Sequence, residues 1–282
     1  MLQHVDNDRL QILVAALNQN CTTLAHRMGL ECDAIVINQC NEIAESMYHY
    51  NGYQIKCYHR KDRGVGLSRN EALSYADAPV ILFGDEDIVY RKGYAQDILQ
   101  AFAQNPQADL LLFNVKQSAG RETYHNTDNG RVRWYNYGRY PAYAIAARRA
   151  RLEEAGIRFS LLFGGGADYS NGEDSLFLRD CLKAGLKMYR STVLIGEETA
   201  RASTWFEGFT DKFFYDRGVL YHYLYGRMAY PFGLRFLYKN RDSFCADKPF
   251  AECKRLFREG IAHGSLSDAD RPDDRTGLTD RS

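Results

Sequence analysis

Short apolar runs alternate with amphipathic segments along the first half of the chain. Several of the runs are apolar at consecutive positions, which is typical of strands in a sheet that is covered on both faces. The predicted strands are LQILVAAL (10–17), DAIVINQ (33–39), YQIKCYHR (53–60), PVILFGDED (79–87) and ADLLLFNVK (108–116). Helices are predicted between them, over 21–29, 41–49, 66–77 and 93–105. This alternation predicts an α/β fold in which a mostly parallel sheet carries helices on both faces.

The second half of the chain has a less regular pattern. Its predicted elements are a strand that runs into a helix (141–156), a glycine-rich loop (163–172), a helix (173–185) and a strand (188–196). Residues 213–238 are rich in aromatic and basic side chains and predict two helices, broken near Pro231. Residues 265–282 offer almost nothing to bury, so a disordered tail is predicted there.

Composition and charge narrow the possible function classes. The 282 residues include 36 basic and 36 acidic side chains, which gives a formal net charge of +0. This balance argues against a nucleic-acid-binding protein, which usually carries a basic excess. The N-terminus lacks a secretory signal, and no stretch approaches the ~18 consecutive apolar residues of a membrane-spanning helix. We therefore expect a cytoplasmic protein, either free or held peripherally at the inner face of the cell membrane.

The cysteines predict neither disulfide nor metal chemistry. There are seven, an odd number, and no two of them form a CxxC pair. This pattern favours small buried side chains in a reducing compartment over a disulfide framework or a zinc site. The seven are Cys21, Cys32, Cys40, Cys57, Cys181, Cys245 and Cys253.

Three adjacent acids, Asp85, Glu86 and Asp87, follow the fourth predicted strand. Ligands of open α/β sheets bind beyond the carboxyl ends of the strands. In extended geometry Asp85 and Asp87 point to the same side, with Cα atoms about 6–7 Å apart, and Glu86 points the other way. This spacing suits a hard divalent cation, Mg²⁺ or Mn²⁺, shared with substrate phosphates. A solvated acidic turn is the alternative.

Two further segments, 61–73 and 171–177, are the second and third candidate motifs, and each carries charged side chains. In KDRGVGLSRNEAL (61–73), Arg69 stands in the first turn of a predicted helix, free to meet an anionic group. In NGEDSLF (171–177), Glu173 and Asp174 open a helix, where the helix dipole favours acids. Either acid can cap the helix, and either can serve as a general base toward a hydroxyl. Because they are adjacent, they are expected to point about 100° apart.

The order of these motifs resembles one enzyme family. DRGVGLSRN, then a strand ending in an acid triplet, then GED at the start of a helix, is similar to the family 2 glycosyltransferases of bacteria, which have the GT-A fold. The similarity covers roughly residues 10–225. LFGGGADYSNGEDSLFLRDCLKAGLK and STWFEGF (203–209) resemble the branch that assembles capsular and other surface polysaccharides. Many relatives have an acidic DDGS-like turn after the second strand, where this chain has NQCN (38–41).

The resemblance implies a domain organisation. It places a GT-A (Rossmann-like) α/β catalytic domain at 1–210, with a nucleotide-binding half at about 10–116 and an acceptor half at about 117–210. A helical extension of aromatic and basic character, 211–264, would pack on this domain, ahead of the tail at 265–282.

The resemblance also implies a reaction. A hexosyl or N-acetylhexosaminyl group would pass, with inversion, from a nucleotide-diphosphate donor such as a UDP-sugar to a hydroxyl of a glycan or lipid-linked acceptor. Asp85 and Asp87 would hold Mn²⁺ or Mg²⁺ as the cofactor, and Asp174 would be the catalytic base. The donor would be bound by Ala16, Leu17, Asn38, Gln39, Arg69, Asp85 and Glu86, and the acceptor by Gly165, Gly166, Glu173 and Trp205.

Each of these assignments has an alternative. Trp205 is a candidate to stack on a sugar, or a core or rim tryptophan. The basic and aromatic segment 212–239 suits a membrane interface, or a helix packed on the sheet with its basic side in water. DEDIV also matches the DxDx[TV] motif of haloacid-dehalogenase-like phosphatases, although three predicted strands precede it here. A GT-A-shaped protein that binds nucleotide or sugar without catalysis is the third possibility.

Overall fold

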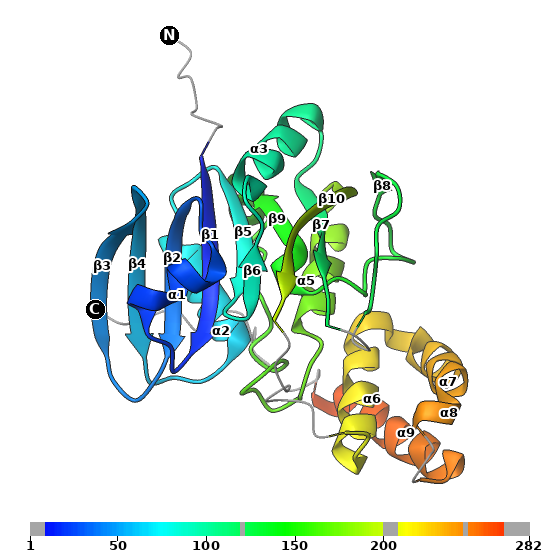
Figure 1. Ribbon diagram of the computed structural model, residues 1–282. Coiled ribbons are helices and arrows are strands. Elements are labelled where there is room, and N and C mark those ends of the chain that lie inside the picture. The colour runs from blue at the N-terminus through cyan, green and yellow to red at the C-terminus, as the bar shows by residue number, and fades with distance from the viewer. Residues whose placement is uncertain (1–8, 119–121, 200–207, 245–247, 268–282) are drawn as a thin grey trace.

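The computed structural model describes residues 9–118, 122–199, 208–244 and 248–267. Within these residues the strands form one ten-stranded sheet (Figure 1). They are β1 (Leu10–Leu17), β2 (Asp33–Gln39), β3 (Ala44–Tyr50), β4 (Tyr53–Arg60), β5 (Val80–Asp85), β6 (Ile88–Tyr90), β7 (Leu110–Lys116), β8 (Gly130–Arg131), β9 (Ile145–Arg148) and β10 (Met188–Glu198). Their order is β3-β4-β2-β1-β5-β9-β7-β10-β6, and β8 pairs with β10.

The first half of the sheet is parallel. β4, β2, β1 and β5 are neighbours that run in the same direction, and the register aligns Leu17 with Gln39 and Ala15 with Asp85. The carboxyl ends of these strands therefore meet at one edge. Beyond β5 the sheet is mixed, because β9 runs antiparallel to both β5 and β7, whereas β10 runs parallel to β7. The predicted α/β architecture is confirmed.

Helices cover the sheet and a continuous apolar core fills the space between them. They are α1 (Cys21–Met28), α2 (Val65–Tyr75), α3 (Tyr94–Gln104), α4 (Arg149–Glu154), α5 (Glu173–Lys183) and the short 3-10 turn η1 (Ala142–Ala144). In Figure 1, α1 lies in front of the sheet and α2 behind it. The rings of Phe83, Phe159 and Phe177 contact one another with centroids 4.2–5.5 Å apart. This contact fixes α5 against β5 directly beneath the acid triplet.

One predicted helix is wrong. Residues 41–49 were expected to be helical, but β3 occupies Ala44–Tyr50 and pairs antiparallel with β4 at the edge of the sheet. The cause is the turn between the two strands, where Asn51 and Gly52 both have positive φ angles, 51° and 89°. A two-residue Asn-Gly turn of this kind joins the strands of a tight hairpin. The Asn-Gly pair was the signal in the sequence that indicates a strand on either side.

The elements after residue 141 agree with the sequence pattern more closely. β9 runs into α4, and Gly156 follows with a φ angle of 62°. The glycine-rich loop leads into α5, and Gly185 after it has a φ angle of 80°. Positive φ angles at helix ends are the reason that glycine is placed there.

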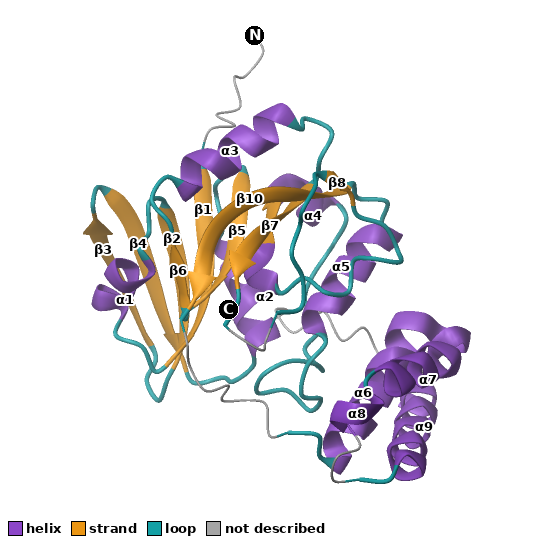
Figure 2. Cartoon of the chain, turned by 45° about the vertical axis from the view of Figure 1, so that its right-hand side comes forward, coloured by secondary structure: helices purple, strands orange, loops and turns teal. Residues whose placement is uncertain are grey.

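The C-terminal helices form a group of their own. They are α6 (Asp211–Tyr225), the 3-10 turn η2 (Gly226–Met228), α7 (Ala229–Lys239), α8 (Arg241–Phe244) and α9 (Phe250–Ser267). Figures 1 and 2 show them beside the sheet, not over either face. Two helices were predicted with a break near Pro231: α6 and α7 are present, but the chain bends at Gly226, with a φ angle of 54°, and Pro231 lies in the first turn of α7, where proline is tolerated. The predicted tail starts at residue 265, but residues 265–267 still belong to α9, so it begins three residues too early; residues 268–282 lie outside the described residues.

The prediction for the cysteines is wrong for one pair. Cys21 at the start of α1 and Cys57 in β4 are joined in a disulfide, although 36 positions separate them in the sequence. Cys32, Cys40, Cys181 and Cys253 are buried, as expected. Cys245 lies outside the described residues.

Candidate active site

The three sequence motifs meet at the carboxyl edge of the parallel strands. β5 brings Asp85 there beside the ends of β1 and β2, and α2 brings Arg69. α5 brings Glu173 and Asp174 from more than a hundred positions further along the chain. Segments distant in the sequence thus converge on one point.

The guanidinium of Arg69 joins these motifs. Its Nη2 donates to both carboxylate oxygens of Asp85, at 2.9 and 3.2 Å. Its Nη1 donates to Glu173 Oε1 at 3.1 Å and to Asp174 Oδ1 at 2.9 Å. The side chain is only 3% exposed. The expectation that Arg69 is free to meet an anionic ligand therefore needs correction, because three carboxylates of the protein already hold it.

Local packing at the start of α2 sets the position of Arg69. A Cβ atom on Gly66 would lie 2.4 Å from the backbone oxygen of Ser160, so only glycine lets α2 approach this segment. One turn further, the side-chain amide of Asn70 donates to the carbonyl of Phe159 at 2.9 Å and accepts from its N–H at 2.7 Å. The helix is thereby locked against the segment that leads to the glycine-rich loop.

The glycine-rich loop lies against the start of the same helix. The N–H of Val65 donates to the carbonyl of Gly165 at 2.9 Å. Gly166 has a φ angle of +84°, and a Cβ atom there would lie 3.1 Å from the backbone nitrogen of Gly64. A Cβ on Gly164 would lie 2.9 Å from the carboxyl carbon of Glu173. The predicted acceptor residues Gly165 and Gly166 therefore contact the start of α2, and their neighbour Gly164 lies against the Glu173 carboxylate.

Glu173 and Asp174 differ in their surroundings although they share Arg69. The Glu173 carboxylate also accepts from the backbone N–H of Gly172 at 3.1 Å, which ties it to the residue before its helix. The side chain of Asp174 is 23% exposed, against 11% for Glu173. Adjacent positions on a helix were expected to diverge, yet both carboxylates reach the same nitrogen of Arg69. Asp174 is the one with more access to solvent and substrate.

Burial and charge change the protonation of Asp174. Burial raises the pKa of the Asp174 carboxyl well above its ordinary value, and the Glu173 carboxylate raises it further, while Arg69 acts in the opposite direction. A carboxylate with a raised pKa is a stronger base than one in water, because it gains more by taking a proton. This is the property that a general base requires.

The acid turn gathers the negative charge of several carboxylates. Burial raises the pKa of Asp87 to about 6, and the carboxylates of Asp85 and Glu198 raise it as well. Glu198 is buried and accepts from the backbone N–H of Ser118 at 3.0 Å. The arginine described above is shared among three carboxylates and bonds to Asp85, not to Asp87. Oxygen ligands with surplus negative charge are the donor set that Mg²⁺ or Mn²⁺ prefers, so the residues fit such an ion.

The remaining predicted donor residues shape the edge of the sheet. Glu86 accepts from the N–H of Leu17 at 2.6 Å, which ties the acid turn to the end of β1 beside Ala16. Asn38 accepts from the N–H of Gln19 at 2.9 Å and donates to its carbonyl at 2.8 Å. Gln39 accepts from the N–H of Gly64 at 3.0 Å.

These contacts show what sequence reasoning missed. The amides at the end of β2 hold two loops in place, the one after β1 and the one before α2, and both loops border the acid turn. Trp205 lies outside the described residues.

Comparison with known proteins identifies the family of the chain. The model of glycosyl transferase family 2 matches residues 6–161, more than half of the sequence. The structure is similar to S. aureus TarS 1–349 in complex with UDP-GlcNAc, at 17% identity and a TM-score of 0.57, over 93% of this chain and 74% of that one. It is also similar to a complex of the same S. aureus fragment with UDP, at 18% identity and a TM-score of 0.52, over 93% of this chain and 73% of that one. The similarity to a longer chain of S. aureus TarS has 17% identity and a TM-score of 0.54, over 90% of this chain and 43% of that one.

The likeness to TarS shows the fold, and the predicted GT-A architecture with a helical C-terminal segment is confirmed. A search of curated proteins found no match.

We expect Arg69 to be essential for the stability of this site. Replacing Arg69 by Gln leaves three neighbouring carboxylates without their cation, and breaking a buried ion pair costs about 3–5 kcal/mol. Urea unfolding should show a loss of this size at pH 8. The loss should shrink as the pH falls toward 5, because burial and the neighbouring Glu173 carboxylate raise the pKa of Asp174 in the folded state, and its protonation removes part of the repulsion.

Arg63→Gln is the matched control. Arg63 lies six residues before Arg69, is exposed, and contacts Asn41. Its loss should change the unfolding free energy by less than about 0.5 kcal/mol. An Arg69→Gln variant as stable as this control at pH 8 would contradict the role of Arg69.

Proposed function

The chain belongs to glycosyl transferase family 2, and we propose that it transfers a sugar, with inversion, from a nucleotide-diphosphate donor to a hydroxyl of a glycan or lipid-linked acceptor. The observation that carries the proposal is the pairing of Arg69 with Asp85 on one side and with Glu173 and Asp174 on the other. Arg69 thereby joins Asp85, in the acid turn after β5, to Asp174 at the start of α5. Ligands of open α/β sheets bind at such strand ends.

Asp174 is the base in this proposal. Inverting transfer is a single displacement, so the group that takes the acceptor proton must lie across the sugar from the departing diphosphate. Asp174 lies on α5, apart from the acid turn after β5, and its raised pKa favours proton uptake. Glu173 is more buried and holds Gly172 and Arg69, which suits it to orient the loop and the acceptor.

Asp85 and Asp87 would hold Mn²⁺ or Mg²⁺. When bound, such an ion supplies Lewis-acid stabilisation for the negative charge of the departing nucleoside diphosphate. Burial, and after it the carboxylates of Asp85 and Glu198, raise the pKa of Asp87, and the closeness of these carboxylates supports this assignment. The chain itself fixes the orientation of the turn, through Arg69 on Asp85 and through the N–H of Leu17 on Glu86.

A uridine nucleotide is the donor we propose. The support is the likeness to S. aureus TarS structures that hold UDP-GlcNAc and UDP. It also favours an N-acetylhexosaminyl group as the transferred sugar. Surface polysaccharide as the product is proposed from the sequence resemblance of LFGGGADYSNGEDSLFLRDCLKAGLK. A haloacid-dehalogenase-like phosphatase loses its support, because β1, β2 and β4 precede the acid turn and the family match includes it.

The helical group supplies a surface for a lipid-linked acceptor. On α7 the buried residues Ala229, Gly233 and Leu237 face the other helices, while Tyr230, Leu234 and Tyr238 are exposed, together with Met228 just before them. Basic residues accompany this apolar row, and residues 226–241 contain no acid; they are Arg227, Arg235, Lys239 and Arg241. An apolar row with basic neighbours is the pattern of a helix lying on an anionic membrane surface. Among the described residues, no helix is both long and apolar enough to cross a membrane.

Asp174→Asn should abolish turnover while donor binding persists. The substitution keeps the size of the side chain and removes the proton acceptor, and loss of a positioned base costs about 10²–10⁴-fold in rate. Arg69 keeps Asp85 and Glu173, so the fold should survive. The wild-type kcat/KM should rise with pH as Asp174 loses its proton, and the residual rate of the variant should lack this dependence. Assays of UDP release and of product mass measure the rates of the wild type and of the variant across pH.

Glu173→Gln separates the two acids. It should lower the melting temperature more than Asp174→Asn does, because Glu173 is more buried and holds the N–H of Gly172, and it should reduce the rate less. Turnover by Asp174→Asn near the wild-type rate would contradict the assignment. Donor binding with no turnover in wild type, across a screen of acceptors, would favour the non-catalytic alternative.

UDP binding should depend on a divalent ion and on the acid turn. Calorimetry in Mn²⁺ should show UDP affinity that falls strongly on addition of EDTA and returns with excess metal. Asp87→Asn should lose affinity in the same way, because it removes a ligand without breaking the pairing of Asp85 with Arg69. Glu197→Gln, an exposed acid next to Glu198, is the control and should bind UDP normally. Unchanged affinity in a folded Asp87→Asn variant would argue against the metal.

Binding to anionic vesicles should depend on the basic residues of α7. The protein should float with phosphatidylglycerol vesicles at low salt and not with phosphatidylcholine. Reversing Arg235 and Lys239 to Glu should weaken binding at least about tenfold, since each basic residue contributes about 1 kcal/mol. Lys116→Glu, an exposed lysine on β7, should have little effect. Absence of flotation at low salt would reject the membrane role.

A further inference from the structure

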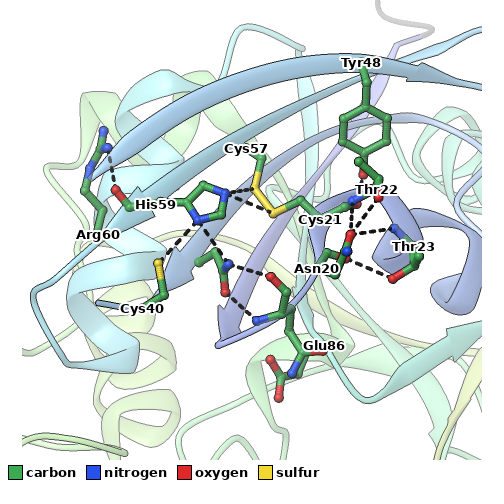
Figure 3. Close-up of a disulfide and its surroundings, with 12 residues drawn as sticks. Asn20, Cys21, Thr22, Thr23, Cys40, Tyr48, Cys57, His59, Arg60 and Glu86 are labelled. Carbon is green, nitrogen blue, oxygen red and sulfur yellow. Dashed lines mark hydrogen bonds between the residues drawn. A yellow bond between two sulfur atoms is a disulfide. The ribbon is translucent and has the colours of Figure 1, made fainter. Parts of the chain in front are cut away.

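A cluster of sulfur and imidazole groups lies beside the loop that follows β1 (Figure 3). Cys21 begins α1, and Cys57 and His59 are two positions apart in β4, so their side chains point to the same face of the sheet. Cys40 directly follows β2. No step of the proposed sugar transfer uses any of these four residues.

His59 lies between the thiol of Cys40 and the disulfide of Cys21 and Cys57 (Figure 3). Its Nε2 is 3.7 Å from the sulfur of Cys57 and 4.0 Å from that of Cys21. The ligand atoms of these three residues all lie within 4.8 Å of one another. Both cysteines are buried, and the His59 side chain is 16% exposed, which leaves access from solvent at the imidazole. Two sulfurs and one nitrogen therefore converge on one small volume.

The other nitrogen of the ring faces a carboxylate. His59 Nδ1 lies 3.1 Å from Glu42 Oε1 and 3.3 Å from the Cys40 sulfur. A histidine that binds a metal through one nitrogen characteristically donates from the other to a carboxylate, which fixes the tautomer and the orientation of the ring. The surroundings of His59 have this arrangement, with Nε2 toward the sulfurs and Nδ1 toward Glu42.

We propose that Cys21, Cys57 and His59 form a zinc site that becomes available when the Cys21–Cys57 disulfide is reduced. Thiolate sulfur and imidazole nitrogen are the ligands that Zn²⁺ prefers, and three protein ligands leave a fourth position for water. The disulfide and the metal are alternatives, because both need the same two sulfurs. Either one ties the start of α1 to β4, next to the donor loop that Asn38 holds through Gln19.

The interconversion balances in two steps. Two equivalents of a small-molecule thiol supply two electrons and two protons: the sulfur–sulfur bond breaks, Cys21 and Cys57 become thiols, and the reductant leaves as its own disulfide. Zn²⁺ then displaces one proton from each thiol, and two protons pass to solvent. Neutral His59 binds the ion through Nε2 without losing a proton.

A second group of ligands shares the same histidine. Cys40, Glu42 and His59 also bring their ligand atoms within 4.8 Å of one another. This group offers one thiolate, and the Glu42 side chain is largely exposed. Two buried thiolates bind Zn²⁺ more strongly than one thiolate and an exposed carboxylate, so the geometry favours the first group with Glu42 as the orienting partner.

The test is zinc binding by the full chain in its two redox states. Protein reduced with a phosphine under argon and freed of metal should take up one Zn²⁺ per chain in competition with a chromophoric chelator. The oxidised protein, with its disulfide intact, should take up none at this affinity. Co²⁺ added to the reduced protein should give thiolate-to-cobalt charge-transfer absorption. This comparison needs no substitution and therefore no assumption about the folding of a variant.

Variants locate the site. Cys57→Ser and Cys21→Ser should lose zinc binding, whereas Cys181→Ser, another buried cysteine, should keep it. Glu42→Gln should weaken zinc binding about 10–100-fold, the usual effect of removing the carboxylate behind a metal-binding histidine. Absence of zinc uptake by the reduced wild type would overturn the proposal. Binding that persists in the oxidised protein and is lost in Cys40→Ser would overturn it in favour of the second group.

Discussion

The structure depends most on the pairing of one buried guanidinium with three carboxylates. Arg69 is almost fully buried, and an arginine in that position must keep its hydrogen bonds, because it cannot lose its charge. Its partners Asp85, Glu173 and Asp174 come from β5 and from the start of α5. Meeting this requirement brings three segments to one point, and the glycines that flank them are the consequence. Gly66 lets α2 approach Ser160, and Gly164 leaves room for the Glu173 carboxylate.

The same pairing connects the two halves of the proposed reaction. On one side Arg69 fixes Asp85, next to the acid turn whose surplus charge suits a metal–diphosphate. On the other side it lowers the pKa of Asp174, against the upward effects of burial and Glu173. The balance leaves the base with a raised pKa but still able to ionise. A lysine could not replace Arg69 here, because a single ammonium lacks the planar guanidinium whose two terminal nitrogens donate to carboxylates on opposite sides.

Strand positions in the first half of the chain could be predicted because consecutive apolar residues report burial on both faces directly. The bounds of β1 and β2 agree with the sequence pattern for this reason. β3 was missed because an exposed edge strand carries no such pattern, and only its Asn-Gly turn indicated it. The motifs of the site were visible in the sequence, but the partners of Arg69 were not. Pairing across 104 positions is decided by tertiary packing. The Cys21–Cys57 contact was hidden for the same reason, since spacing along the chain says nothing about neighbours across a sheet.

The helical group also takes part in the site through the loop it supports. The Asp216 carboxylate on α6 accepts from the N–H of Ser170 at 2.9 Å, and Lys212 donates to the carbonyl of Asp168 at 2.7 Å. Leu220 lies where a Cβ atom on Gly172 would be, 2.5 Å away, so α6 packs directly against the residue before Glu173. The loop that delivers the base is thus held between α2 on one side and α6 on the other. α7 belongs to the same group of helices and turns its aromatic and basic residues outward. The proposed membrane surface on α7 and the loop that leads to the proposed base are thus tied to the same helix, α6.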